Sequence, residues 1–159
     1  MSIRVFLADD HMMVREGLKQ LLELNDEIEV IGEAGDGYEC LNLVNKTNPD
    51  VVLLDINMPN LDGLKVLQIM REQKMQNKVI FLTIHKEVDY LVQAMDYGCD
   101  GYILKDSDFA TLVEAIETVY EGKTYIEPSL TNLLNANLAE RDVMQDKIKI
   151  GRASCRERV

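Results

Sequence analysis

A short, unbroken apolar run between two acids constrains the fold of this chain most strongly. Val51–Leu54 contains no polar residue, while Asp50 precedes the run and Asp55 follows it. A strand that is apolar on both faces is typical of a parallel sheet covered by helices on either side. The run is far shorter than the roughly 20 residues that cross a membrane. It therefore predicts a buried strand in the middle of an α/β domain.

Apolar runs alternate with segments of helical period along most of the chain. We expect five strands, at Ile3–Ala8, Ile28–Ala34, Val51–Leu54, Lys78–Thr83 and Gly101–Leu104. We expect five helices, at Met12–Leu24, Tyr38–Lys46, Leu61–Glu72, Lys86–Tyr97 and Ser107–Glu121. This alternation predicts an α/β fold with a doubly wound, five-stranded parallel sheet and helices on both faces, joined by right-handed crossovers.

Capping residues mark the ends of several expected helices. Asp36 is suited to cap the second helix, and Asp106 or Ser107 to cap the fifth, because their side chains accept backbone hydrogen bonds. Gly98 and Gly122 are expected to end the fourth and fifth helices. These residues divide the chain into the segments that the apolar pattern also indicates.

Length and composition limit the organisation of the chain and its partners. A chain of 159 residues favours one domain with an appendage. Its 17 basic and 28 acidic residues give a net charge of -11, which makes this segment unsuited to bind nucleic acid phosphates. The three cysteines lack metal-ligand spacing, so we expect free thiols in a reducing compartment. We expect no signal peptide and no membrane contact, and therefore a cytoplasmic protein.

Chemically different polar groups end four of the five expected strands, at the edge where open α/β sheets build their sites. The residues are Asp9, Asp10, Asp55, Thr83 and Lys105. Adjacent carboxylates repel each other unless a cation lies between them, and Mg²⁺ prefers oxygen ligands. Asp55 is a potential nucleophile toward phosphorus. A hydroxyl and an ammonium group suit phosphoryl oxygens. The combination predicts a phosphoryl-accepting aspartate, Asp55, beside a Mg²⁺ site.

Each residue also has an ordinary interpretation when it is taken alone. An acidic pair after a strand is often a solvated turn, and Asp10 is a candidate helix N-cap. Asp55 is equally a strand-end residue that meets water. His11 and His85 lie far apart in the sequence, so we expect them to flank the site or pack rather than to bind zinc. The backbone carbonyl of Asn57 is a candidate to join the metal ligands.

Residues 3–121 resemble the receiver domain of bacterial two-component response regulators. The motifs that carry the resemblance are LADDH at 7–11, VLLDINMP at 52–59, DG at 62–63, LT at 82–83 and GYILK at 101–105. Residues 98–105 and 122–126 look most like the NarL/FixJ (LuxR-type) subfamily, whose members carry a C-terminal helix-turn-helix for DNA. The resemblance implies the flavodoxin-like receiver fold.

The resemblance also implies roles for the residues of the expected site. Asp55 would accept a phosphoryl group from a sensor histidine kinase. The ligands of Mg²⁺ would be Asp9, Asp10, Asp55 and the backbone carbonyl of Asn57. The protein would then be a signalling switch rather than an enzyme, apart from Mg²⁺-dependent self-phosphorylation and autodephosphorylation.

Activation and output follow from the same resemblance. Thr83 and Lys105 would contact the phosphoryl oxygens. Thr83 and Tyr102 would move together as the switch, with the tyrosine ring turning inward. The surface of the fourth helix, fifth strand and fifth helix would change and favour a homodimer. Ile84 is bulkier than the residue common after the threonine, and Asp106 stands where other subfamilies have a proline.

The resemblance divides the chain into three parts. Residues 1–122 would be the receiver, 123–140 a linker with a short helix, and 141–159 a tail that is disordered or of artificial origin. Transcription would be regulated through a C-terminal DNA-binding domain that is not present here. A stand-alone receiver acting by protein binding is the alternative. An aspartyl-phosphate hydrolase of the haloacid dehalogenase type is disfavoured, because it needs a second aspartate where Asn57 stands and a nucleophile after its first strand.

Overall fold

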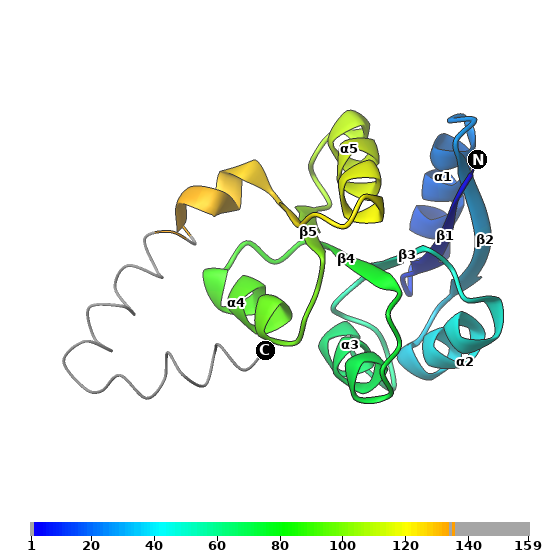
Figure 1. The fold of residues 1–159 in the computed structure, drawn as a ribbon, viewed down its shortest axis with the longest axis horizontal. Coiled ribbons are helices and arrows are strands. Elements are labelled where there is room, and N and C mark those ends of the chain that lie inside the picture. The colour runs from blue at the N-terminus through cyan, green and yellow to red at the C-terminus, as the bar shows by residue number, and fades with distance from the viewer. Residues whose placement is uncertain (1, 134, 136–159) are drawn as a thin grey trace.

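The computed structural model describes residues 2–133 and 135, and within them the chain forms one parallel sheet of six strands (Figure 1). The strand order is β2-β1-β3-β4-β5-β6. The strands are β1 (Ile3–Ala8), β2 (Ile28–Ala34), β3 (Val51–Leu54), β4 (Lys78–Thr83), β5 (Gly101–Leu104) and β6 (Tyr125–Ile126). The helices are α1 (Met12–Glu23), α2 (Gly37–Thr47), α3 (Gly63–Glu72), α4 (Val88–Asp96) and α5 (Phe109–Tyr120). The predicted doubly wound α/β fold is confirmed, and β6 is an addition to it.

Two apolar layers enclose the sheet, one on each face. Along β3, Val52 and Leu54 belong to the layer that includes residues of α2, α3 and α4. Val51 and Leu53 belong to the opposite layer, with residues of α1 and α5. This alternation follows from the two-residue period of a strand. All four side chains are buried, which confirms that the apolar run is a central strand covered on both faces.

The helix caps agree with the sequence in one case and differ in another. The Asp36 carboxylate accepts a hydrogen bond from the Glu39 N–H at 2.8 Å, as predicted. The prediction that Asp106 or Ser107 caps the last helix is wrong, because Asp108 is the N-cap and accepts from the Thr111 N–H. The Ser107 hydroxyl is engaged elsewhere, by Glu127. Asp106, Ser107 and Asp108 are all suitable N-cap residues, so the sequence alone does not show which of them caps the helix.

Helix ends depend on a few backbone positions. Gly98 and Gly122 follow α4 and α5 with φ angles of 95° and 92°, in the left-handed region that favours glycine, which confirms both as helix stops. The helices expected from Leu61 and Lys86 begin two residues later, at Gly63 and Val88. Asp62 caps the first of these two helices through the Lys65 N–H.

Gly63 brings the start of α3 against the end of β3. Its N–H donates to the Ile56 carbonyl at 2.7 Å. A Cβ at this position would lie 2.1 Å from the backbone carbonyl oxygen of Asp55. Only glycine allows this approach, so the loop between β3 and α3 folds tightly over the residues that follow the strand.

The chain beyond α5 returns to the sheet. β6 pairs in parallel with β5, and residues 128–133 form a helical turn beside it (Figure 1). Leu130 is 2% exposed and belongs to the core layer on the α4 side.

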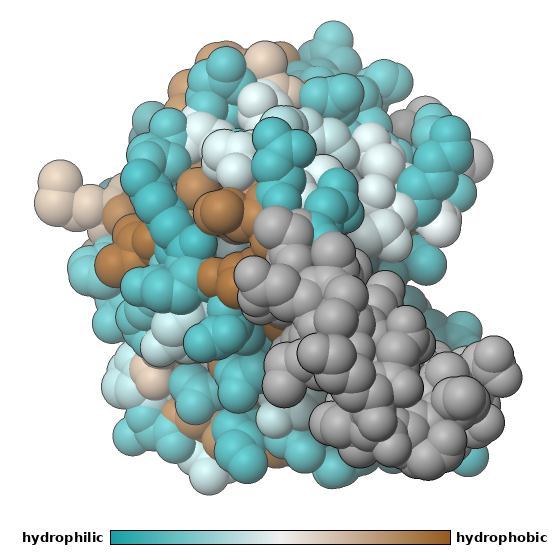
Figure 2. Space-filling model, turned by 90° about the vertical axis from the view of Figure 1, so that its left-hand side faces the viewer, coloured by the Kyte–Doolittle hydropathy of each residue, from teal (hydrophilic) through white to brown (hydrophobic). Residues whose placement is uncertain are grey.

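On the face viewed in Figure 2, hydrophobic side chains gather among hydrophilic ones. None of the helices that the structure describes is both long and apolar enough to span a membrane.

Candidate functional site at the sheet edge

The predicted site residues meet at the carboxyl edge of the sheet. Asp9 and Asp55 lie one residue beyond β1 and β3, and Lys105 lies one residue beyond β5. Backbone hydrogen bonds hold all three in line, from Asp9 N to Ala34 O, from Asp55 N to Ala8 O and from Lys105 N to Thr83 O. Their positions therefore follow directly from the ladder of parallel strands.

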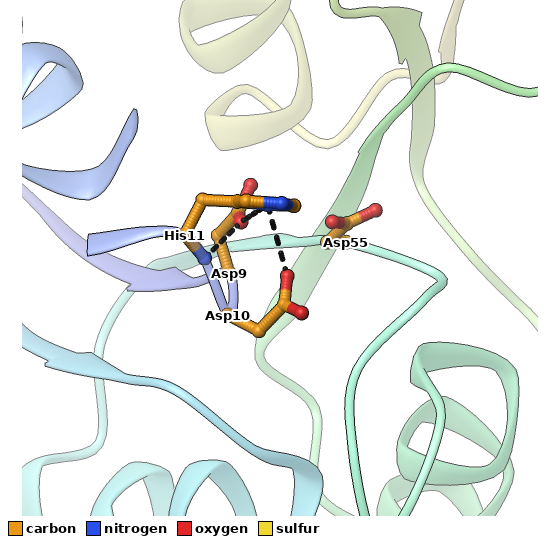
Figure 3. Close-up of side chains that lie close together, drawn as sticks. All are labelled: Asp9, Asp10, His11 and Asp55. Carbon is orange, nitrogen blue, oxygen red and sulfur yellow. Dashed lines mark hydrogen bonds and ion pairs between the residues drawn. The ribbon is translucent and has the colours of Figure 1, made fainter. Parts of the chain in front are cut away.

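Three acids and one histidine form a compact cluster at this edge. Asp9, Asp10, His11 and Asp55 each offer one ligand atom, and these atoms lie within 4.8 Å of one another (Figure 3). Asp9 and Asp55 are buried, at 4% and 5% exposure, whereas Asp10 and His11 are exposed. Clustered carboxylate oxygens at the mouth of a buried site are the donor set that a hard divalent cation prefers.

Lys105 compensates the two buried acids. Its Nζ lies 2.7 Å from Asp9 Oδ2 and 3.0 Å from Asp55 Oδ2. The lysine side chain is 19% exposed, so both ion pairs are largely shielded from water. An ammonium group in this position stabilises negative charge at either carboxylate, and it equally suits the oxygens of a bound phosphoryl group.

The two buried carboxyls differ in their affinity for protons. Burial raises the pKa of Asp9, but hydrogen bonds from Lys105 and His11 and the lysine charge outweigh it, so the pKa is lowered. Burial raises the pKa of Asp55 above its ordinary value, despite the hydrogen bond and charge of Lys105. Burial lowers the pKa of Lys105, yet its bonds to both acids dominate and raise it. The ammonium is therefore held in its charged form.

His11 lies closer to the acids than its sequence position indicated. Its backbone N–H donates to Asp9 Oδ1 at 2.8 Å. Its Nδ1 lies 3.2 Å from Asp9 Oδ1 and 3.0 Å from Asp10 Oδ1 (Figure 3). A flanking role was expected for His11, and the fold turns the imidazole toward both carboxylates. Spacing along the sequence gives no sign of this, because the contact depends on the turn after β1.

His85 connects the residues of the expected switch. Its N–H donates to Thr83 Oγ1 at 3.1 Å, and its carbonyl accepts from the Tyr102 hydroxyl at 2.9 Å. Its Nε2 lies 2.8 Å from the Asn57 side-chain nitrogen, and its ring stacks on Tyr90 with centroids 4.1 Å apart. Thr83 and Tyr102 are both fully buried, so the tyrosine ring lies inward in this structure. These contacts of His85 were not predicted from the sequence.

The mouth of the site carries an apolar residue and an exposed ion pair. Ile84 is 65% exposed and lines an opening with Leu104 and Lys105. Lys86 Nζ and Asp106 Oδ2 lie 3.2 Å apart at the same opening. The Lys105–Asp106 peptide bond is trans. Asn57 is exposed in the β3–α3 loop, and its N–H hydrogen-bonds the Asp55 carboxylate.

Known proteins resemble this chain in sequence and in fold. A family model described as the response regulator receiver domain matches residues 5–117. The chain is 38% identical over 133 residues to the transcriptional regulatory protein DegU of Brevibacillus brevis, covering 84% of this chain and 56% of that protein. It is 35% identical over 147 residues to the nitrate/nitrite response regulator protein NarL of Escherichia coli (strain K12), covering 89% and 68%.

A solved structure has the same fold over most of the chain. The crystal structure of a LuxR-family two-component response regulator from Aurantimonas sp. SI85-9A1 superposes with a TM-score of 0.83 at 30% identity, and covers 87% of this chain and 99% of that one. The chain spans little more than half the length of DegU.

Proposed function

Because this chain belongs to the family of response regulator receiver domains, we propose that it accepts a phosphoryl group on Asp55 from a sensor histidine kinase. The observation that carries the proposal is the position of Lys105. Its Nζ lies between the buried carboxylates of Asp9 and Asp55, within 2.7 and 3.0 Å of them. This arrangement places a cation beside a shielded carboxylate that could serve as the nucleophile.

The transfer step requires the Asp55 carboxylate in its ionised form. One of its oxygens attacks the donor's phosphorus, a P–O bond forms, and the P–N bond to the donor imidazole breaks. The electron pair stays on the imidazole nitrogen. Burial raises the pKa of Asp55, and the hydrogen bond and charge of Lys105 lower it again in part; Lys105 would then neutralise an oxygen of the acquired phosphoryl group. The Thr83 hydroxyl would bind another oxygen.

The donor set of the site fits a hard divalent cation. Three carboxylates offer oxygens within a common span of 4.8 Å, and the cluster is rich in negative charge. Asp9, Asp10, Asp55 and the Asn57 backbone carbonyl would hold Mg²⁺, which when bound neutralises charge on the phosphoryl oxygens. The three carboxylates would also repel each other less with that ion present.

The switch is proposed to act through Thr83 and Tyr102. The Thr83 hydroxyl accepts from the His85 N–H, and the Tyr102 hydroxyl donates to the His85 carbonyl. A phosphoryl group that draws the threonine toward itself would change the first bond and, through His85, the second. We propose that phosphorylation stabilises the inward tyrosine and favours a homodimer through the surface of α4, β5 and α5.

The role of the longer protein is a further part of the proposal. The relatives named above include a transcriptional regulatory protein and a nitrate/nitrite response regulator. We infer that residues 1–122 act as a cytoplasmic receiver and that 123–140 lead to a C-terminal DNA-binding domain. Residues 134 and 136–159 lie outside the described part, and so does the expected tail at 141–159.

The test is phosphorylation by acetyl phosphate, followed by intact mass. With Mg²⁺ the wild type gains one phosphoryl group, and a chelator prevents the gain. Asp55→Asn abolishes it, because an amide is a poor nucleophile, whereas Asp26→Asn, at an exposed position away from the site, behaves as wild type. Sustained turnover of p-nitrophenyl phosphate over many cycles would instead indicate a hydrolase and contradict the proposal.

A further inference from the structure

Glu127 is a buried carboxylate outside the acidic site. It is 8% exposed, and its Oε1 accepts hydrogen bonds from the Leu104 N–H at 3.1 Å and from the Ser107 hydroxyl. Within residues 2–133, no lysine, arginine or histidine nitrogen forms an ion pair with it. A buried carboxylate without a cation is costly unless its hydrogen bonds are good. Its position therefore calls for an explanation beyond packing.

The end of β6 explains why a side chain is needed at this position. Tyr125 N donates to Asp100 O at 3.0 Å, and Glu127 N donates to Tyr102 O at 2.8 Å. The backbone then leaves the sheet, because residues 128–133 are helical. The next donor on β5, the Leu104 N–H, would lose its partner at the open edge of the sheet. The Glu127 carboxylate supplies the acceptor that the strand no longer provides.

The two donors that Glu127 binds stand on either side of Lys105. Leu104 precedes the lysine and Ser107 follows it by two residues, and the Ser107 N–H closes a turn onto the Leu104 carbonyl at 3.0 Å. On the β4 side, the Lys105 N–H donates to Thr83 O at 2.8 Å. The backbone that carries Lys105 is thus held by β4 on one side and by Glu127 on the other.

Glu127 also holds the beginning of the helical residues 128–133. Its carbonyl accepts from the Leu130 N–H at 2.9 Å and from the Thr131 hydroxyl at 3.3 Å. Leu130 is buried in the same core layer as Tyr102. One residue therefore joins the loop of Lys105 to the helical residues 128–133.

We propose that Glu127 is a positioning residue for Lys105, and that it couples the acidic site to residues 125–133. The proposal rests on the proposed function, because Lys105 is the group that meets the phosphoryl oxygens. Docking of residues 125–133 fixes the Lys105 backbone through Glu127. By linkage, a phosphoryl group that draws Lys105 changes the docking of residues 125–133 by the same coupling free energy.

The experiment compares Glu127→Ala, Glu127→Gln and Ser107→Ala with Glu121→Ala, a control at an exposed glutamate. Glutamine keeps the acceptor oxygen, so Glu127→Gln retains the wild-type rate of phosphorylation by acetyl phosphate. Glu127→Ala loses the acceptor and slows that rate about tenfold, the ratio that corresponds to one hydrogen bond. Ser107→Ala slows it less. Rates are measured well below each variant's melting temperature, so that lost stability alone does not alter them.

Two further measurements separate this proposal from the proposed function. In unmodified protein, Glu127→Ala shifts the NMR signals of the Lys105 side chain, and this result needs no phosphorylation. In the wild type, phosphorylation changes hydrogen exchange at residues 125–133, and Glu127→Ala removes that response. If the wild type takes up no phosphoryl group, the proposed function is wrong. The NMR signals of Lys105 in unmodified protein still test whether Glu127 positions the lysine.

Folded Glu127→Ala and Ser107→Ala proteins with wild-type rates and unchanged Lys105 signals would show that Glu127 only fills space. If Glu127→Ala does not fold, Ser107→Ala decides by the same criteria, because the serine is small and only partly exposed. A matching loss of rate in Glu121→Ala would also contradict the inference.

Discussion

Lys105 Nζ lies 3.0 Å from Asp55 Oδ2 although β4 separates their strands. Thr83, a small and fully buried residue, ends the intervening strand β4. The same ammonium contacts Asp9 at the end of β1. One side chain thereby links the carboxyl ends of three strands, and the charge balance of the site depends on it.

Replacing Lys105 by methionine should raise the pKa of both buried carboxyls, because the lysine lowers each of them. In the wild type without divalent ions, Asp55 takes up its proton at a higher pH than Asp9, with their pKa values above and below the ordinary 3.8. An NMR titration of the carboxyl carbons measures both. Unchanged values in Lys105→Met would contradict the assigned charge balance.

The same pKa shifts predict how stability depends on pH. The lowered pKa of Asp9 contributes stability that is present above pH 3.8 and is lost as the pH falls through the folded-state value. The raised pKa of Asp55 acts oppositely, so its contribution is present below pH 3.8 and is lost as the pH rises through the folded-state value. Lys105→Met should lower the free energy of unfolding at neutral pH by roughly 3 kcal/mol, since two buried acids lose their cation. Denaturant titrations at several pH values measure this.

Gly63→Ala should distort the site as well as destabilise the fold. The added Cβ would lie 2.1 Å from the Asp55 carbonyl oxygen, so the backbone at Asp55 must move. We expect a loss of roughly 1–3 kcal/mol and slower phosphorylation. Gly17→Ala is the matched control, because its Cβ meets nothing within 4 Å in α1 and should stabilise the helix by up to about 1 kcal/mol. Equal effects of the two substitutions on phosphorylation would rule out a specific role for the close approach.

Much of the site follows from the sequence for a definite reason. Asp9, Asp55 and Lys105 each come one residue after a strand, and parallel strands bring their carboxyl ends to one edge. The apolar runs in the sequence are therefore enough to predict that these three residues lie close together. The cap at Asp36 follows equally from local chemistry, since a side chain bonding three residues ahead needs no distant partner.

The remaining features depend on contacts between distant segments. β6 has only two residues, too few to show a period, and it exists because β5 offers an open edge. His85 meets Asn57, 28 residues away, only when two loops fold over the sheet. Glu127 meets Leu104 across 23 residues in the same way. None of these pairs leaves a local pattern that sequence reasoning detects.

Mg²⁺ at one hundred times its dissociation constant should raise the free energy of unfolding of the wild type by about 2.7 kcal/mol by mass action, and should therefore raise its melting temperature. Asp10→Ala should reduce the rise, because the residue supplies one of the clustered ligand atoms. Asp26→Ala serves as a charge-matched control. Melting curves with millimolar Mg²⁺ or a chelator make the comparison, and a wild type indifferent to Mg²⁺ would exclude the metal site.

Thr83→Ala should leave phosphorylation of Asp55 largely intact but separate it from association. The substitution removes the hydroxyl that now accepts from His85 and that would contact the phosphoryl group. Sedimentation of unmodified and phosphorylated protein, wild type and variant, reports association. If the phosphorylated variant associates as the wild type does, Thr83 does not couple the site to the outer surface.

The position of the acquired phosphoryl group tests the account most directly. After phosphorylation by acetyl phosphate with Mg²⁺, borohydride reduction converts an aspartyl phosphate to homoserine, and peptide mass spectrometry locates that residue. The account predicts homoserine at residue 55 of the wild type, and none in Asp55→Asn. Homoserine at Asp9 or Asp10 instead, or undiminished modification of Asp55→Asn, would contradict it.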